Sequence, residues 1–316
     1  MNKPLKIIFA GTPIFAAEHL SALLASNYQV LAVFTQPDRS SGRGQKIHYS
    51  KVKELTINYN IPCFQPINLN TKKIYNIIKN INADVMLVVA YGLILPASII
   101  RLFPQSCINI HPSLLPRWRG PAPIQWALLE GDKKTGVTVI KMNNNIDTGD
   151  ILYSNSCYIE KHDTYDSLQK KLIVLSIEAM LTTLCNLVNN TYHSSIQDNR
   201  YATYAKKINK IDAKLNWHIN AITLERCVRA FNPSPVTFFL LNKVLIKVWQ
   251  ATTYLSPYEN KKIGEIIIAD KTGIHINTID GIFNIVKLQI SGKKIMTTEE
   301  FLNSKKSWFQ SGNILK

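Results

Sequence analysis

An amide and an imidazole stand two residues apart at the end of a predicted buried strand. The segment CINIHPSLLP, residues 107–116, places Asn109 and His111 among apolar neighbours. In a strand, residues i and i+2 point to the same side, so both side chains face one crevice. Pro112 follows at once and helps to end the strand, because proline donates no backbone hydrogen bond.

A carboxylate follows the next predicted strand, residues 136–142. The polar run NNNIDTGD, residues 143–150, contains Asp147. If the two strands lie close together, Asp147 meets His111 beyond the strand ends, where open α/β sheets bind ligands. A single polar residue after a strand is more often a turn former or a helix cap. Three of them at two neighbouring strand ends favour a functional site over separate turn formers.

An amide, an imidazole and a carboxylate without a Ser or Cys nucleophile suit the transfer of an acyl group between two external partners. The attacking amine must lose a proton, and a side-chain amide can stabilise the oxyanion of the tetrahedral intermediate. An imidazole can donate to that oxyanion or move protons, and a nearby carboxylate would hold the ring in place.

Short β-branched strands alternate with helices over residues 1–189, which we expect to form the first domain. Strands are predicted at 6–10, 29–36, 62–64, 84–90, 107–111 and 136–142. Helices are predicted at 14–26, about 71–81, 124–130 and about 164–189. This alternation predicts the α/β class, with a Rossmann-like, doubly wound and mostly parallel sheet covered on both faces.

The character of the sequence changes after this domain. Residues 190–209 are polar and aperiodic, which is typical of a linker. Residues 210–316 begin with a predicted helix at about 218–231, and short strand-like runs broken by turns follow it. That spacing predicts a small C-terminal β-barrel that is OB-like.

Charge and composition narrow the class of protein. The 316 residues include 37 Lys and Arg against 21 Asp and Glu, a net charge of +16, which favours a nucleic-acid partner. Compositional drift in a chain rich in Lys, Asn and Ile is the alternative. Five scattered cysteines, no signal peptide and no uninterrupted apolar span of about 20 residues predict a cytoplasmic protein without a membrane anchor. No metal-ligand cluster stands out.

Motifs along nearly the whole chain resemble those of one family. The run from Asn109 to Pro116, with Asp147-Thr-Gly-Asp150 downstream, resembles the signature of formyltransferases that use 10-formyltetrahydrofolate. Further motifs are similar to those of methionyl-tRNA formyltransferases: FAGTP at 9–13, QPDRSSGRG at 36–44, VVAYGLILP at 88–96, LLPRWRG at 114–120 and RAFNPSP at 229–235.

This resemblance implies a reaction and a set of site residues. Asn109, His111 and Asp147 would be the catalytic trio, and the formyl group of 10-formyltetrahydrofolate would pass to the α-amine of initiator methionyl-tRNA. No metal is implied. The folate co-substrate would contact Ser113, Leu114, Leu115, Pro116, Tyr91, Gly92, Leu93, Asn143, Asn144 and Asn145.

The resemblance also implies contacts with tRNA. The cationic loop 38–46 would enter the acceptor arm, with Arg43 as the main contact and Arg39 and Lys46 beside it. Lys206 and Lys207 in the linker would face the same tRNA. From composition alone, a merely solvated loop is the alternative. We expect a monomer.

Two departures from the family pattern and two other functions stay open. Asn145 stands where the family often has Gly, and Ser234 replaces an expected Trp between two prolines. The same chemistry on a small amine, such as a nucleotide sugar or a purine precursor, would need no basic second domain. A tRNA- or RNA-binding module with a decayed site would not consume 10-formyltetrahydrofolate.

Overall fold

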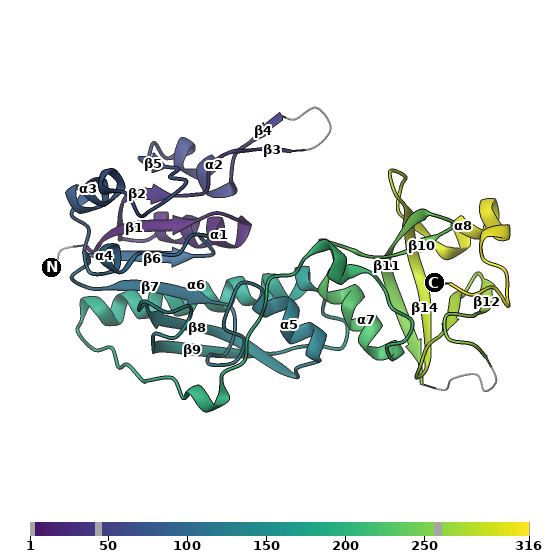
Figure 1. Ribbon diagram of the computed structural model, residues 1–316. Coiled ribbons are helices and arrows are strands. Elements are labelled where there is room, and N and C mark those ends of the chain that lie inside the picture. Colours follow the sequence, from purple (N-terminus) through teal and green to yellow (C-terminus); the bar gives the residue numbers. More distant parts are fainter. Residues whose placement is uncertain (1–3, 42–45, 256–260, 316) are drawn as a thin grey trace. The chain divides into compact units, whose positions relative to one another are not determined.

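The computed structural model describes residues 4–41, 46–255 and 261–315 (Figure 1). Contacts between residues divide the chain into two compact units. The N-terminal unit contains residues 1–123, 134–158 and 169–205. The C-terminal unit contains residues 124–133, 159–168 and 206–316.

A seven-stranded sheet forms the centre of the N-terminal unit, in the order β5-β2-β1-β6-β7-β8-β9 (Figure 1). Its strands are β1 Lys6–Gly11, β2 Gln29–Phe34, β5 Cys63–Phe64, β6 Val85–Val89, β7 Cys107–His111, β8 Lys134–Lys141 and β9 Asp150–Tyr158. The strands from β5 to β7 are parallel, whereas β8 is antiparallel to both of its neighbours. The predicted Rossmann-like, mostly parallel sheet is confirmed, and it has an antiparallel edge.

Burial explains why these strands read as apolar runs. All five residues of β6 are buried, and in β1 only Lys6 is not fully buried. Strands that are buried on both faces lose the alternation of apolar and polar residues that marks a half-exposed strand. Each of these strands could therefore be recognised in the sequence as a continuous apolar run.

Helices and short strands connect the sheet. The helices are α1 Ile14–Leu24, α2 Lys51–Asn58, α3 Lys72–Ile81, α4 Ala97–Ile100, α5 Pro123–Glu130 and α6 Tyr165–Val188. The short strands β3 Arg39–Ser41 and β4 Lys46–His48 pair with each other in an antiparallel ladder. Residues 39–41 and 46 of the predicted cationic loop therefore belong to this ladder, and Arg43 lies outside the described residues.

Helix α6 is long and apolar enough to cross a membrane by length and composition alone. Its buried side chains, however, recur every three or four residues along one side: Leu168, Leu172, Ser176, Ala179, Met180, Thr183, Leu184 and Leu187. One-sided burial with helical spacing is the pattern of a helix that packs a stripe against a protein core. The buried stripe accounts for part of the hydropathy of α6.

The polar segment after α6 is tied to the N-terminal unit as far as Ala205. Ser195 forms an antiparallel bridge with Ile151, and the short 3-10 helix η1 spans Asn199–Tyr201. The backbone N–H of Arg119 donates to the carbonyl of Thr203 at 2.9 Å, and the N–H of Ala205 donates back to Arg119 at 2.8 Å. This segment therefore lies beside the residues that follow β7.

The C-terminal unit contains an antiparallel sheet of six strands in the order β10-β11-β14-β13-β12, with β15 paired to β14. Its strands are β10 Thr237–Leu241, β11 Val244–Tyr254, β12 Ile266–Asp270, β13 Gly273–Asn277, β14 Ile282–Ile290 and β15 Met296–Thr297. Its helices are α7 Ala221–Ala230 and α8 Thr298–Lys305, with short 3-10 turns η2 Lys210–Ala213 and η3 Lys306–Trp308. The predicted second β-rich part is confirmed as this sheet, while its description as an OB-like barrel stays a prediction.

Aromatic rings fill the core of the C-terminal unit. Trp217 lies 5.6 Å from Phe239 and 5.9 Å from Phe283 between ring centroids, and Phe301 lies 5.6 Å from Phe309. These inclined, offset arrangements are the favoured ones for aromatic pairs. Apolar side chains of α7 pack against the same cluster, so this unit has a core of its own.

Candidate active site

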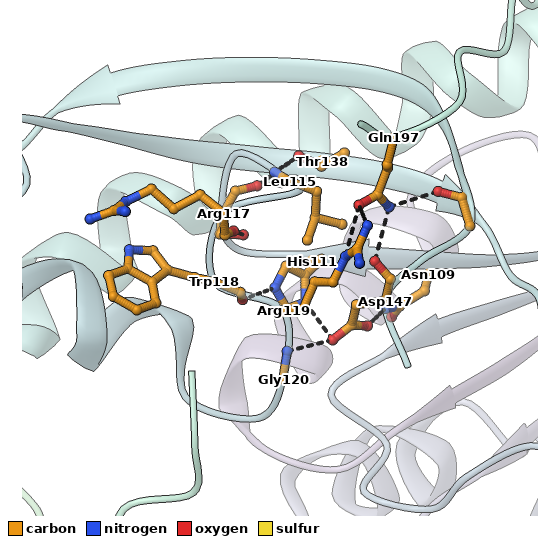
Figure 2. A network of polar contacts seen from close by, with 12 residues as sticks. Asn109, His111, Leu115, Arg117, Trp118, Arg119, Gly120, Thr138, Asp147 and Gln197 are labelled. Atoms are coloured by element: carbon orange, nitrogen blue, oxygen red, sulfur yellow. Dashed lines mark hydrogen bonds and ion pairs between the residues drawn. The ribbon is translucent and has the colours of Figure 1, made fainter. Parts of the chain in front are cut away.

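Strand β7 presents Asn109 and His111 on one side of the sheet, as their spacing predicts (Figure 2). His111 is only 4% exposed and Asn109 is half-buried. Nδ2 of Asn109 donates a hydrogen bond to Oδ1 of Asp147 at 3.2 Å. The structure therefore brings together the amide, the imidazole and the carboxylate that sequence reasoning selected.

Both ring nitrogens of His111 have a polar neighbour. Nε2 lies 2.8 Å from the backbone oxygen of Trp118, and Nδ1 lies 3.6 Å from Oδ2 of Asp147. A carbonyl oxygen only accepts, so Nε2 carries the hydrogen of that bond. Nδ1 is then the nitrogen at which this ring can take up or release a proton, and it faces the carboxylate.

The carboxylate of Asp147 is fixed from two directions besides His111. The backbone N–H of Gly120 donates to Oδ2 at 2.8 Å, and Asn109 holds Oδ1. Asp147 itself has a φ of 53°, in the left-handed region that few residues other than Gly, Asn and Asp adopt readily. The loop is thus shaped so that this one side chain points back at β7.

The route by which Asp147 reaches β7 differs from the expectation. The sequence argument places residues 143–150 at the same end of the sheet as His111. In the structure β8 runs antiparallel to β7, so Lys141 at the end of β8 pairs with Ile108 near the start of β7. The loop from β8 to β9 must therefore extend back along β7. Gly149 permits this close return, because an added Cβ would lie 1.8 Å from the backbone oxygen of Lys141.

A buried arginine and glutamine lie close to the trio, and sequence reasoning missed the glutamine (Figure 2). Nε and Nη2 of Arg119 donate to Oε1 of Gln197 at 3.1 and 2.8 Å. Nε2 of Gln197 donates to the backbone oxygens of Asp147 at 2.9 Å and Gly149 at 2.8 Å. Gln197 lies in a polar, aperiodic segment, and nothing in its local sequence signals this contact.

The loop after His111 contains four of the residues expected to contact folate, and Thr138 of β8 holds it in shape. Oγ1 of Thr138 donates to the backbone oxygen of Ser113 at 2.7 Å and accepts the N–H of Leu115 at 3.0 Å. Oγ of Ser113 donates to the backbone oxygen of Arg117 at 2.6 Å. Leu114 and Pro116 are half-buried in the same loop.

Residues 91–93 also belong to the expected folate site, and their side chains lie in different environments. The ring of Tyr91 is 2% exposed and belongs to the apolar core of the N-terminal unit. Burial raises the pKa of its hydroxyl, which has no hydrogen-bond partner among the described residues. Gly92 is exposed and Leu93 is half-buried, so Leu93 is the accessible apolar side chain here.

Asn143, Asn144 and Asn145 are exposed in the loop before Asp147. Oδ1 of Asn143 accepts the backbone N–H of Asn145 at 3.0 Å and the hydroxyl of Thr148 at 2.8 Å. The side chain of Asn143 therefore shapes the loop that carries the carboxylate.

The cations expected to contact tRNA are distributed over both units. Arg39 is exposed in the N-terminal unit, and its Nη2 donates to Oε1 of Gln36 at 3.4 Å. Lys206 and Lys207 are exposed at the start of the main segment of the C-terminal unit. Arg43 and the side chain of Lys46 lie outside the described part of the chain. Over the described residues, no group of three or more His, Cys, Asp or Glu side chains could hold a metal ion.

Comparison with known proteins gives matches along nearly the whole sequence. The profile of the family described as Formyl transferase matches residues 5–184, and that described as Formyl transferase, C-terminal domain, matches residues 207–306. A methionyl-tRNA formyltransferase from Buchnera aphidicola subsp. Schizaphis graminum (strain Sg) is 49% identical over 313 residues, which are 99% of this chain and 100% of that protein. A methionyl-tRNA formyltransferase from Buchnera aphidicola subsp. Acyrthosiphon pisum (strain Tuc7) is 50% identical with the same coverage.

Solved structures of more distant proteins share the fold. HypX from Aquifex aeolicus in complex with tetrahydrofolic acid matches with a TM-score of 0.63 at 15% identity, over 99% of this chain and 51% of that chain. An N-formyltransferase from Helicobacter canadensis matches with a TM-score of 0.63 at 20% identity, over 92% of this chain and all of that chain.

Two family profiles match the chain, and relatives of about 50% identity match it over their full length. Both findings point to the same family as the motifs that contain Asn109, His111 and Asp147. The chain belongs to the methionyl-tRNA formyltransferase family.

Proposed function

We propose that this protein transfers the formyl group of 10-formyltetrahydrofolate to the α-amine of initiator methionyl-tRNA, giving formylmethionyl-tRNA for translation initiation. The observation that carries the proposal is the convergence of Asn109, His111 and Asp147 at one place in a chain of this family. The three groups supply an amide donor, a proton carrier and a fixed negative charge, as acyl transfer to an amine requires.

The residues around the trio fit a folate co-substrate in chemical character. A flat heterocycle with a polar edge needs apolar contacts and a few fixed polar groups. Leu93, Leu114 and Pro116 offer half-buried apolar surface, and the backbone of the loop 143–147 offers polar groups. We propose that all ten residues expected from the family resemblance, at 91–93, 113–116 and 143–145, surround this co-substrate, with Tyr91 supporting the site from the core.

Asn109 is the proposed donor to the formyl oxygen. Its side-chain amide has two hydrogens, and over the described residues Asp147 is the one hydrogen-bond partner of that amide. The remaining hydrogen is available to an acceptor in the crevice. As the amine attacks, negative charge grows on the formyl oxygen, and a donor that is already positioned stabilises it without reorganisation.

His111 is proposed to stabilise the same oxygen, and Asp147 to tune His111 and to help move the proton of the attacking amine. The new bond joins the amine nitrogen to the formyl carbon, the bond from that carbon to the folate nitrogen breaks, and the amine proton ends on the folate nitrogen. Asp147 orients the imidazole through Nδ1 and relays protons through water. The backbone oxygen of Trp118 fixes the ring from the opposite side.

We propose a functional division into a formyltransferase domain at 1–189, a linker at 190–209 and an OB-like tRNA-binding domain at 210–316. Residues 206–316 hold 17 Lys and Arg against 8 Asp and Glu, which suits a phosphate backbone. Register shifts along the long strand β11 are of the kind that curl a sheet toward a barrel.

The proposed tRNA contacts are Arg39, Arg43 and Lys46 on the acceptor arm, with Lys206 and Lys207 nearer the second domain. Cationic side chains bind phosphates without reading base sequence, so these residues would position the tRNA. We further propose that the protein acts as a cytoplasmic monomer. Its five cysteines are free, as expected in a reducing compartment.

A formyl-transfer assay with several acceptors tests this function. The purified chain is incubated with 10-formyltetrahydrofolate and either methionyl-initiator tRNA, methionyl-elongator tRNA or a nucleotide-linked amino sugar. We expect formylation of the initiator tRNA only. Transfer to the amino sugar alone would overturn the assignment of the acceptor, and salt-sensitive tRNA binding without any transfer would overturn the assignment as an enzyme.

A further inference from the structure

We propose that Gln197 and Arg119 are positioning residues, which hold the backbone of the Asp147 loop so that its carboxylate meets Asn109 and His111. Neither side chain is placed in contact with the reacting groups. The inference rests on the proposed function, because it assigns these residues a role in formyl transfer.

The four hydrogen bonds of the Gln197 amide saturate the group. Its oxygen accepts two N–H groups from Arg119, at 3.1 and 2.8 Å, and its nitrogen donates to two backbone oxygens, at 2.9 and 2.8 Å. An amide oxygen has two lone pairs and an amide nitrogen has two hydrogens, so no capacity remains unused. Arg119 can only donate, and it therefore fixes which end of the amide faces the loop.

Burial makes these bonds strong and costly to break. Arg119 is 3% exposed and Gln197 is 5% exposed. Hydrogen bonds from a charged donor are stronger than neutral ones, and a buried polar group that loses its partner keeps the full cost of its desolvation. Nη2 of Arg119 also donates to Oδ1 of Asn199 at 2.9 Å, which anchors the guanidinium to the same segment.

The two backbone oxygens that Gln197 holds lie on either side of Thr148. One belongs to Asp147, which has a left-handed φ of 53°. The other belongs to Gly149, whose backbone packs against the carbonyl of Lys141. Fixing both oxygens fixes the peptide groups around Asp147, and hence the direction of its side chain.

Residues 119–120 act on Asp147 in two ways, directly on its carboxylate and indirectly on its backbone. The N–H of Gly120 donates to the carboxylate at 2.8 Å, while the side chain of the preceding Arg119 acts on the loop backbone through Gln197. Movement of residues 119–120 would therefore shift both supports of the carboxylate together. This arrangement is suited to fixing the position of the Asp147 carboxylate.

The variant Gln197→Glu separates placement from folding. A glutamate keeps the size of the side chain and pairs well with Arg119, but it presents acceptor oxygens to the two loop carbonyls instead of donors. We expect kcat for formylation of methionyl-initiator tRNA to fall about 10- to 100-fold, because small misplacement of a catalytic group has effects of this size. The KM for tRNA should stay close to that of the wild-type chain. The thermal midpoint should fall, because the two loop carbonyls lose their buried donors, so kcat is compared at a temperature at which both chains are folded.

Gln29→Glu is the matched control, since it makes the same chemical change at an exposed position of the same unit. It should leave kcat within about twofold of wild type, as surface substitutions usually do. A Gln197→Glu chain that also keeps wild-type kcat would overturn the positioning role.

If Gln197→Glu does not fold, Arg119→Lys tests the same contact between Arg119 and Gln197 by changing the arginine. Lysine keeps a buried positive charge and a donor to Oε1 of Gln197, but it loses the paired geometry of the guanidinium. In a folded Arg119→Lys chain, kcat should fall below the wild-type value. The loss should be smaller than the loss expected for Gln197→Glu. Wild-type kcat in this chain would overturn the proposal.

Hydrogen exchange of the full chain distinguishes failure of this inference from failure of the proposed function. If the wild-type chain does not formylate methionyl-tRNA, the proposed function fails. Faster amide exchange over residues 142–149 in the folded variant, Gln197→Glu or Arg119→Lys, than in the wild type would still support the positioning role. Unchanged exchange there would overturn it.

Discussion

Nδ1 of His111 lies 3.6 Å from Oδ2 of Asp147, and the Gly120 N–H donates to that same oxygen. The carboxylate is thereby fixed by the backbone on one side and faces an imidazole on the other. In the proposed mechanism the negative charge orients His111, whereas the two oxygens hold Gly120 and Asn109 by hydrogen bonds. The two contributions can be separated by substitution.

Asp147→Asn removes the charge and keeps the shape. Asparagine tolerates the left-handed φ of 53° and can still accept the N–H of Gly120 through its side-chain oxygen. Its amide nitrogen then faces the Asn109 amide, so the hydrogen bond to Asn109 is lost together with the charge. We expect kcat to fall about 100-fold or more, in the range found for the loss of acid–base function. Steady-state kinetics at saturating folate should show an unchanged KM for tRNA. Near-wild-type kcat would show that the charge has no part in the reaction.

Asn109→Ala removes the proposed donor to the formyl oxygen. Loss of one such donor costs on the order of 10²–10³ in kcat. Asn76→Ala, at an exposed position of α3, is the control for loss of an amide elsewhere in the same unit. Direct measurement of tRNA affinity should give the wild-type value for both variants. Loss of tRNA binding in Asn109→Ala would contradict a catalytic role.

The stability of the N-terminal unit should depend on pH through His19. This residue is fully buried in α1, and burial lowers its pKa from 6.5 to about 4, although its hydrogen bond to the Phe15 carbonyl opposes this shift. The unfolded chain binds a proton at His19 between these values and the folded chain does not, so stability falls as pH drops through that window. The loss approaches about 3 kcal/mol below pH 4.

His19→Leu removes this titration and keeps an apolar side chain of similar size. Urea unfolding of both chains from pH 7 to pH 4 gives the difference in free energy of unfolding. We expect the wild type to lose stability relative to the variant as the pH falls. A difference that is constant across this range would show that His19 is not responsible.

Lys206 and Lys207 should act by binding phosphates of the tRNA backbone. Replacing both with Ala should raise the KM for methionyl-tRNA and lower its dependence on salt by about 0.7–0.9 in log–log slope for each phosphate that is no longer neutralised. Folate kinetics and kcat should change little, because the trio is untouched. Replacing Lys293 and Lys294, also exposed in the C-terminal unit, is the control. If both double replacements changed the KM for methionyl-tRNA equally, the lysines would contribute only through nonspecific positive charge.

Continuous apolar, β-branched runs predicted the parallel part of the sheet well. The buried strands β1, β6 and β7 lie where apolar, β-branched runs were found, because burial on both faces leaves a clear signal. The direction of β8 could not be predicted in this way. An apolar strand of either direction has the same composition, and the choice depends on connections made elsewhere in the chain.

The trio was predictable for two different reasons. The spacing of Asn109 and His111 places them on one side of any strand, whatever the sheet around it. The approach of Asp147 needed the resemblance to a known family, because the argument from strand ends assumed a parallel neighbour. Gln197 could be found by neither route, since it acts through backbone oxygens, which are the same in every sequence.

Helix α8 did leave a signal that was overlooked. Thr297 and Glu300 form a capping box, in which each side chain bonds the backbone N–H of the other residue. The pattern Thr-x-x-Glu before a helix is a recognised start signal. The many strand-like runs in the C-terminal part favoured a prediction of strands alone, so this helix was not predicted.

Single-turnover formyl transfer by the wild-type chain and by His111→Ala tests the central claim most directly. Both chains are saturated with 10-formyltetrahydrofolate and methionyl-initiator tRNA, and tRNA affinity is measured in parallel. The account predicts rapid transfer by the wild type, a loss on the order of 100-fold or more in the variant, and equal tRNA affinity. Transfer by His111→Ala at the wild-type rate would contradict the account.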